Sequence, residues 1–313
     1  CYFGITPWNM RRLSIDESDL SFSILIFGIF FVLSNQIAGR ILVPKYGTKR
    51  VMSLAFPLIT FSSLLSITSS SYLFFLLTFI PAGIGWGASG PIGGIHSQLI
   101  EKHFKKIITP YYAMGFNIGI LVGGGLAGII MRYNFEPYIF FLVLSFSSIL
   151  VAFLVLHLGL PSNLDFKGKG EKFKIPELNV LIFGFLLFFV FGSGGIIMDW
   201  STLWLSKDLN TPLYLASTGL IFFSIGGILA NLFSNTLINI FTEKVVGCYF
   251  VMIGSSILLL SLLTNNFYII LGVLCIYGFA IANLVPIVIR QAVKQSNESI
   301  PMTVTNLITI GLS

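Results

Sequence analysis

The sequence is poor in charge, in cysteine and in the residue groupings that enzymes and metal sites need. Only 10% of its 313 residues are charged, whereas 55% are hydrophobic. Its three cysteines, Cys1, Cys248 and Cys275, lie in or beside apolar segments without paired or metal-ligand spacing, so neither a disulfide framework nor a metal site is expected. No phosphate-cradling GxxxxGK loop and no nucleophile elbow occur. An ATP-driven pump and an enzyme are therefore disfavoured, and no cofactor is implied.

What the chain has instead is a succession of apolar segments, each about 20 residues long, which is the length that crosses a bilayer as a helix. Short polar joints separate them. The pattern predicts an all-α polytopic membrane protein with about ten visible spans. They lie near residues 21–40, 51–70, 72–98, 109–131, 137–160, 178–198, 213–240, 246–264, 267–289 and 301–313.

The basic residues fall into alternate joints, and this asymmetry predicts the topology. Of the 18 lysines and arginines, 14 lie in one set of joints, which the positive-inside rule makes cytoplasmic. The net charge of +6 therefore comes from basic residues that orient the helices and interact with anionic lipid. It does not indicate a nucleic-acid partner. The opposite set holds only Arg11, Arg12, Arg132 and Lys207.

The longest polar joint, residues 161–177, predicts a central cytoplasmic linker between two helical halves, 1–160 and 178–313. We expect the first helix to be largely missing and the last to be truncated, so that restoring one helix at each end gives two six-helix halves. Such a plan is typical of transporters built from repeats, which bind substrate near the midplane. Before the first complete span, Ser14 and Glu17 predict a capping box.

Four motifs give the chain a family resemblance. They are AGRILVPKYGTKRV at 38–51, GIGWGASGPIGG at 83–94, MDWSTLWLSKDL at 198–209 and GFAIANLVP at 278–286. In order and spacing they resemble the major facilitator superfamily, and more narrowly its bacterial branch related to the fucose permease. The resemblance implies a loop that controls conformation between the second and third helices, with candidate residues Gly39, Arg40, Lys45, Gly47, Lys49 and Arg50.

The chain also departs from the family pattern. The superfamily loop usually has an acidic residue where Pro44 stands, and the matching position of the second half is predicted at Asn235. Polar groups of the branch are replaced by Gly90 and Gly94, and an acid by Ser193. Polar recognition groups are therefore fewer than in the branch.

Of the 12 acidic residues, only Asp199 follows an apolar run without lying in a polar joint. A carboxylate in a membrane is costly, which makes Asp199 a candidate for proton coupling or gating. The alternative is that Asp199 and Trp200 occupy the outer interface. His96 could relay protons, but its closeness to the joint at Glu101 favours an interfacial hydrogen bond.

Uncharged polar residues within the spans predict a substrate cavity. The resemblance implies that helices one, four, seven and ten line it, which favours Trp86, Ser89, Ser193, Tyr277 and Asn283. Hydroxyls and amides beside an aromatic face suit a polar solute such as a sugar. Alternatively, such groups bond neighbouring helices. The glycines Gly115, Gly119, Gly123 and Gly128 have GxxxG-like spacing and predict close helix packing.

These patterns together predict a secondary transporter that moves a small polar organic solute, such as a sugar, by alternating access with protons. Its alternatives are an exporter of drug-like or metabolite molecules and a non-transporting sensor on a transporter fold. The expected partners are the solute, protons and membrane lipid, without nucleic acid. We expect a monomer in the bacterial cytoplasmic (inner) membrane.

Overall fold

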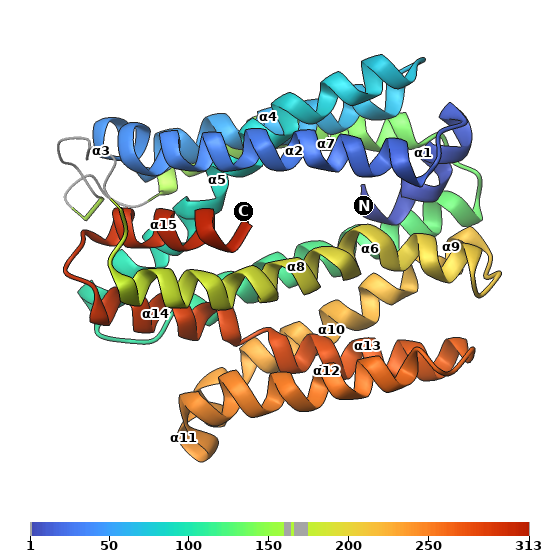
Figure 1. Cartoon of the computed structure of the whole chain (residues 1–313). Coiled ribbons are helices and arrows are strands. Elements are labelled where there is room, and N and C mark those ends of the chain that lie inside the picture. Colours follow the sequence, from blue (N-terminus) through green and yellow to red (C-terminus); the bar gives the residue numbers. More distant parts are fainter. Residues whose placement is uncertain (1, 160–163, 166–174, 313) are drawn as a thin grey trace. The chain divides into compact units, whose positions relative to one another are not determined.

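The computed structural model describes residues 2–159, 164–165 and 175–312, and its regular elements are helices (Figure 1). Within this described part, nine helical spans are long and apolar enough to cross a membrane, and one shorter apolar helix follows them. Because a bilayer offers no water to backbone N–H and C=O groups, an apolar chain satisfies these groups within its own helices. The predicted all-α polytopic class is confirmed.

The helices before the linker follow the predicted segments closely. They are η1 (Phe3–Ile5), α1 (Thr6–Leu13), α2 (Glu17–Ile37), the π-helical turn η2 (Ala38–Leu42), α3 (Val43–Tyr46), α4 (Thr48–Thr68), α5 (Tyr72–Phe104), α6 (Thr109–Arg132) and α7 (Pro137–Leu158).

The helices after the linker include several that are broken by turns. They are α8 (Leu178–Lys207), α9 (Leu213–Ala216), α10 (Thr218–Leu232), α11 (Ser234–Lys244), the π-helical turn η3 (Val245–Tyr249), α12 (Phe250–Ser261), α13 (Phe267–Ile281), α14 (Leu284–Gln295) and α15 (Ile300–Leu312).

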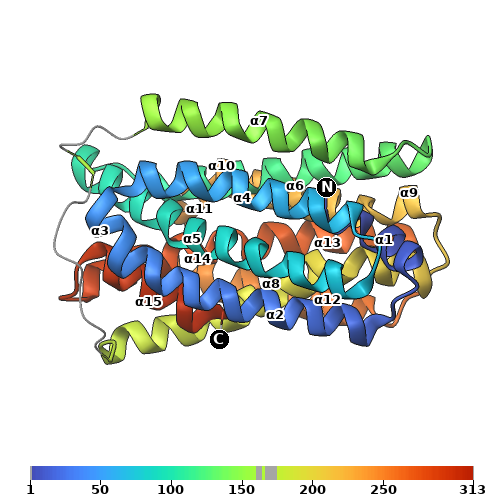
Figure 2. The same ribbon diagram turned by 90° about the horizontal axis from the view of Figure 1, so that it is seen from above.

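The chain forms two compact units, and each combines segments from both sides of the linker. The first unit holds residues 1–9, 107–135 and 190–290, and the second holds 10–106, 136–189 and 291–313. In the first unit, α10 contacts α6 and α13, and α12 lies along α13 (Figure 1). In the second unit, α4 packs against α5 and α7, and α2 packs against α5 (Figure 2). The division at the linker into two six-helix halves stays a prediction.

Two predicted boundaries are wrong. The N-cap of α2 is Asp16, whose carboxylate accepts a hydrogen bond from the backbone N–H of Asp19 at 2.9 Å, so Ser14 and Glu17 form no capping box. Ser14 instead has a left-handed backbone with φ 53°. The second error concerns α8, which continues past the predicted end at residue 198 to Lys207. The single charge of Asp199 does not stop a helix whose next residues are mostly apolar.

The turn before α4 and the turn near the end of α11, both cytoplasmic in the predicted topology, share one unusual backbone shape. Gly47 has φ 82° and ψ 163°, and Thr242 has φ 70° and ψ 157°. The same sequence separation relates Tyr72 to Phe267, the first residues of α5 and α13. When Gly47 is aligned with Thr242, the residue equivalent to Pro44 is Asn239, which lies three residues before Thr242. The backbone shape of the two turns therefore favours Asn239, four residues after Asn235, as the counterpart of Pro44.

Thr242 occupies a backbone region that suits glycine, and a β-branched residue there is strained. We expect Thr242→Gly to raise the thermal stability of the purified protein by about 1 kcal/mol, since relief of strain exceeds the added freedom of the unfolded chain. Loss of the monodisperse gel-filtration peak on heating measures this. Thr242→Ala is the matched control, because it keeps a Cβ at the same φ. Equal stabilisation by both variants would contradict the strain.

Candidate functional site

Asp199 lies within a membrane-spanning helix and not at its end. Lys207 ends α8, so the Cα of Asp199 is about 12 Å inside that end at the usual helical rise. The side chain is partly buried, and its nearest small neighbour is Gly195, where an added Cβ would lie 4.0 Å from Asp199 Oδ2. Among the described residues the carboxylate of Asp199 takes part in no hydrogen bond or ion pair. This geometry leaves a carboxylate available for exchange with a proton or a ligand.

Two of the predicted cavity residues meet in the first unit. The hydroxyl of Tyr277 on α13 interacts with the hydroxyls of Ser193 on α8 and Ser255 on α12. The Tyr277 ring is almost completely buried and lies 6.2 Å from the ring of Phe223. Ser193 also donates a hydrogen bond to the carbonyl of Val190 at 3.0 Å. Three hydroxyls from three helices thus gather on the unit that carries Asp199. We call Ser193, Ser255 and Tyr277 the hydroxyl cluster.

The remaining predicted cavity residues do not join this cluster. The amide nitrogen of Asn283 donates to the carbonyl of Ala230 at 2.9 Å, which ties α10 to the segment between α13 and α14. Trp86 and Ser89 lie on α5 in the second unit, partly buried, and the Ser89 hydroxyl donates to the Trp86 carbonyl at 3.0 Å. Asn283 therefore makes the helix-to-helix bond that the sequence left as an alternative. The cavity role of all five stays a prediction.

His96, the other ionisable candidate within a span, is partly buried on α5. Asp165 of the linker acts electrostatically on its imidazole. Nearby, Gln98 donates to Glu101 at 3.2 Å. His96 thus lies near Asp165, at the end of α5 that the predicted topology makes cytoplasmic.

The second unit contains a polar contact between α2 and α15, two helices from opposite sides of the linker. Arg40, which is 7% exposed, donates from Nη2 to Asn306 Oδ1 at 2.7 Å and from Nε to Gln36. Asn35 donates from Nδ2 to Thr309 Oγ1 at 2.6 Å and to the carbonyl of Thr305 at 3.1 Å. We call this set the α2–α15 clasp. It consists of Asn35, Gln36, Arg40, Thr305, Asn306 and Thr309.

The charge of Arg40 is balanced through an amide. Asn306 accepts from Arg40 with its oxygen, and its nitrogen donates to Glu298 Oε2 at 3.0 Å. Glu298 Oε1 in turn accepts from the backbone N–H of Glu177, just before α8, at 3.4 Å. Because a buried guanidinium is costly without polar partners, this relay accounts for an arginine in a tight helix contact.

Gly39 permits the close approach of α15. A Cβ at this position would lie 2.7 Å from Thr305 Cβ, which is closer than real side-chain atoms approach. The predicted loop residues that follow Gly39 and Arg40 in sequence do not take part in the clasp. Lys45 lies 5.0 Å from the ring centroid of Tyr46, Lys49 packs beside Gly159, and Arg50 is exposed.

The predicted glycine face of α6 packs only in part. An added Cβ at Gly128 would lie 3.0 Å from both Ser217 Oγ and the carbonyl of Tyr214, and Gly123 is buried. At Gly115 and Gly119, an added Cβ would meet nothing within 4 Å among the described residues. At the end of this helix, the guanidinium of Arg132 lies 5.9 Å from the ring centroid of Tyr214. This end is the outer one in the predicted topology.

An ion pair with a buried arginine lies beside the turn at Thr242. Arg290 on α14 donates to Glu243, which directly follows Thr242, at 2.5 Å. Their side chains are 5% and 23% exposed. Glu243 stands beside the strained turn in the position that Thr48 occupies beside Gly47.

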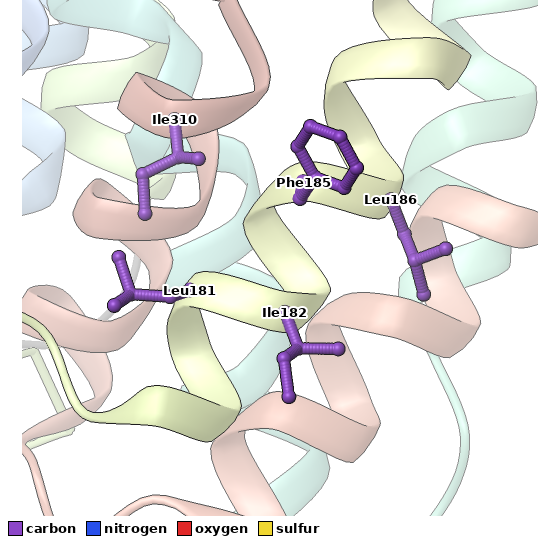
Figure 3. A pocket seen from close by; sticks show the side chains of 5 residues that line it. All are labelled: Leu181, Ile182, Phe185, Leu186 and Ile310. Atoms are coloured by element: carbon purple, nitrogen blue, oxygen red, sulfur yellow. The ribbon is translucent and has the colours of Figure 1, made fainter.

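An apolar groove of about 450 Å³ in the second unit lies between one face of α8 and Ile310 of α15 (Figure 3). Its other lining side chains are Leu181, Ile182, Phe185 and Leu186. Close by, an added Cβ at Gly184 would lie 2.7 Å from Ile310 Cβ. With no polar group in its lining, the groove offers nothing to orient a polar solute.

Sequence reasoning missed the partners that α15 supplies to the clasp. Thr305, Asn306 and Thr309 fall on one face of an otherwise mostly apolar helix, and this spacing is the signal that could have found them. The partners of Asn35 and Gln36 lie about 270 positions away in sequence, so no local pattern pairs them.

In the described part of the chain, nine helical spans long and apolar enough to cross a membrane define a polytopic helical membrane protein. The family model of the Major Facilitator Superfamily matches residues 1–312, and the chain belongs to this superfamily. It is a multi-pass membrane transporter.

One relative is an uncharacterised MFS-type transporter of Yersinia pestis, 23% identical over 318 residues, which cover 98% of this chain and 79% of the relative. Among solved structures, the nucleoside transporter NupG matches with a TM-score of 0.67 and 12% identity, covering 99% of this chain and 83% of NupG. The human organic anion transporter MFSD10 matches with a TM-score of 0.65 and 16% identity, covering 99% and 80%. These likenesses show the fold.

The fit of Gly39 against Thr305 predicts a sharp difference between two glycines of one helical span. Gly39→Ala should destabilise the purified protein by about 1–3 kcal/mol, because the new methyl group overpacks the contact with α15. Gly28→Ala is the matched control, since its Cβ would meet nothing within 4 Å and alanine favours the helix. Thermal denaturation in detergent measures both. If Gly39→Ala is as stable as Gly28→Ala, the clasp is not closely packed.

Proposed function

We propose that this protein is a proton-coupled secondary transporter of a small polar organic solute, with Asp199 as the group that carries the proton. The observation that carries the proposal is a carboxylate about 12 Å inside a membrane-spanning helix, without a hydrogen bond or ion pair among the described residues. An ionisable group within a membrane-spanning helix is costly, and a coupling role accounts for that cost.

The hydroxyl cluster supports a polar, largely uncharged substrate class. Ser193, Ser255 and Tyr277 can each donate and accept a hydrogen bond, and the rings of Tyr277 and Phe223 supply an aromatic face. Sugars and sugar-bearing molecules present hydroxyls and an apolar ring face to such a surface. Among the structural neighbours, one is named a nucleoside transporter and another an organic anion transporter. The narrower likeness to the fucose-permease branch favours a sugar.

Alternating access requires contacts at both ends of the helices that break in turn. The α2–α15 clasp lies at the cytoplasmic end of the predicted topology, and the contact of Arg132 with Tyr214 lies at the outer end. Each joins a helix from before the linker to one from after it. We infer that the clasp closes the cytoplasmic side, in a monomer in the bacterial inner membrane.

Asp199→Asn tests the coupling. In proteoliposomes with an inward proton gradient, we expect the variant to lose gradient-driven uptake of its solute by at least tenfold, because an amide cannot carry a proton. Exchange of solute without a gradient should persist, since binding and conformational change remain. Uptake across a panel of sugars, nucleosides and organic anions measures both activities.

Asp208→Asn is the control, because Asp208 is an exposed carboxylate just beyond the end of α8. It should transport like wild type. If uptake is the same with and without the gradient, and the same in wild type and Asp199→Asn, the coupling is contradicted and facilitated diffusion or export is favoured. Binding without flux of any solute would instead favour a sensor.

Arg40→Ala tests the cytoplasmic closure. With the native cysteines replaced by serine, Thr305→Cys provides a reporter, because Thr305 is fully buried and its hydroxyl makes no hydrogen bond in the described part of the chain. When Arg40→Ala is combined with Thr305→Cys, a membrane-impermeant maleimide should label this cysteine faster in inside-out vesicles. Arg50→Ala, at an exposed arginine of the same loop, should leave it unchanged. Equal rates in all three proteins would show that the clasp does not close the site.

A further inference from the structure

The central linker contributes one carboxylate to the cytoplasmic turn of the first half. Asp165 accepts two hydrogen bonds from the backbone N–H of Thr48, with Oδ1 at 3.1 Å and Oδ2 at 2.9 Å. The Thr48 hydroxyl donates a third to Oδ1 at 2.9 Å. Thr48 is the first residue of α4 and is 1% exposed. The carboxylate thus occupies the N-terminal end of a helix, where exposed N–H groups and the helix dipole favour negative charge.

The turn is shaped to receive this carboxylate. Gly47 has a positive φ of 82°, which side chains rarely adopt, and an added Cβ would lie 2.5 Å from Asp165 Oδ2. Glycine therefore serves two needs here, the backbone conformation of the turn and the space for a group that comes from more than 100 residues further along the chain.

A second contact, just after α7, reaches the same turn of α4. Gly159 follows the last residue of α7, and an added Cβ there would lie 3.1 Å from Lys49 Cβ. Lys49 is the residue after Thr48. The first turn of α4 is therefore contacted twice, by Gly159 and by Asp165.

The turn stands between this docking point and the clasp. Gly47 joins α4 to α3, and α3 continues directly into η2, which carries Gly39 and Arg40. A change in the turn would therefore move the guanidinium that bonds Asn306 of α15. We propose that Asp165 docks on the first turn of α4, and that this contact positions Arg40 and stabilises the α2–α15 clasp.

Asp165 acts in this proposal as a positioning residue, so its test needs a readout of docking and a readout of the clasp. A nitroxide on Leu164→Cys, next to Asp165, reports the mobility of the linker. The maleimide labelling of Thr305→Cys in inside-out vesicles reports the clasp. Asp165→Ala and Thr48→Val should each mobilise the nitroxide and raise the labelling rate by up to about tenfold, as expected for loss of a hydrogen bond to a charged group.

Three further variants make the result specific. Thr48→Ser keeps the hydroxyl and should behave like wild type, and Asp208→Asn, at the far end of α8, should change neither readout. The double variant Asp165→Ala with Thr48→Val should change both readouts no more than Asp165→Ala alone, because Asp165→Ala already removes the hydrogen bond that Thr48→Val takes away.

Two outcomes would overturn the proposal. If the nitroxide is equally mobile in wild type and Asp165→Ala, the linker is not docked through this carboxylate. If the nitroxide is mobilised but labelling of Cys at position 305 is unchanged, docking does not position Arg40. Should Asp165→Ala fail to fold, the pair Thr48→Val and Thr48→Ser decides the question alone.

Discussion

The cost of placing a charge where water is excluded is the constraint on which the rest of the structure depends. Most of the 12 acids and 18 bases lie in joints between spans, as this cost requires. Arg40 and Asp199 are exceptions, and they differ in one respect. Arg40 is embedded in a relay of amides that ends on Glu298. Asp199 has no such relay among the described residues. The first arrangement suits a contact that holds, and the second suits a group that changes its protonation or its partner.

Amide side chains are well suited to a contact that must also release. The Asn306 amide accepts from a guanidinium and donates to a carboxylate at the same time, so two opposite charges are stabilised without touching each other. A direct buried ion pair is expensive to separate, because each partner is left uncompensated. The second half has such a pair in Arg290 and Glu243, both within one unit and near one turn. The amide relay instead joins helices from opposite sides of the linker.

The sequence predicted the spans well because hydropathy and backbone hydrogen bonding in lipid leave the chain little choice. The sequence did not predict the helix ends that depend on a single polar residue and its neighbours. Asp16, and not Ser14, is the N-cap of α2, and α8 continues past Asp199. The partners of Arg40 and Thr48 lie in α15 and in the linker, and no local pattern reports such pairings. Ser193 and Tyr277 were singled out, whereas their neighbour Ser255 was not, since a serine in a span is more often a helix-packing residue.

The two cytoplasmic turns show how one backbone shape can be maintained by different chemistry. Gly47 adopts the positive φ without strain and leaves room for the carboxylate of Asp165, which arrives from the linker. Thr242 adopts nearly the same φ and ψ with a branched side chain, and the next residue, Glu243, supplies a carboxylate from the turn itself. A β-branched residue persists in such a conformation only when its surroundings determine it. The pair of Glu243 with Arg290 anchors the residue next to Thr242, and it is the interaction at this turn that can hold such a conformation.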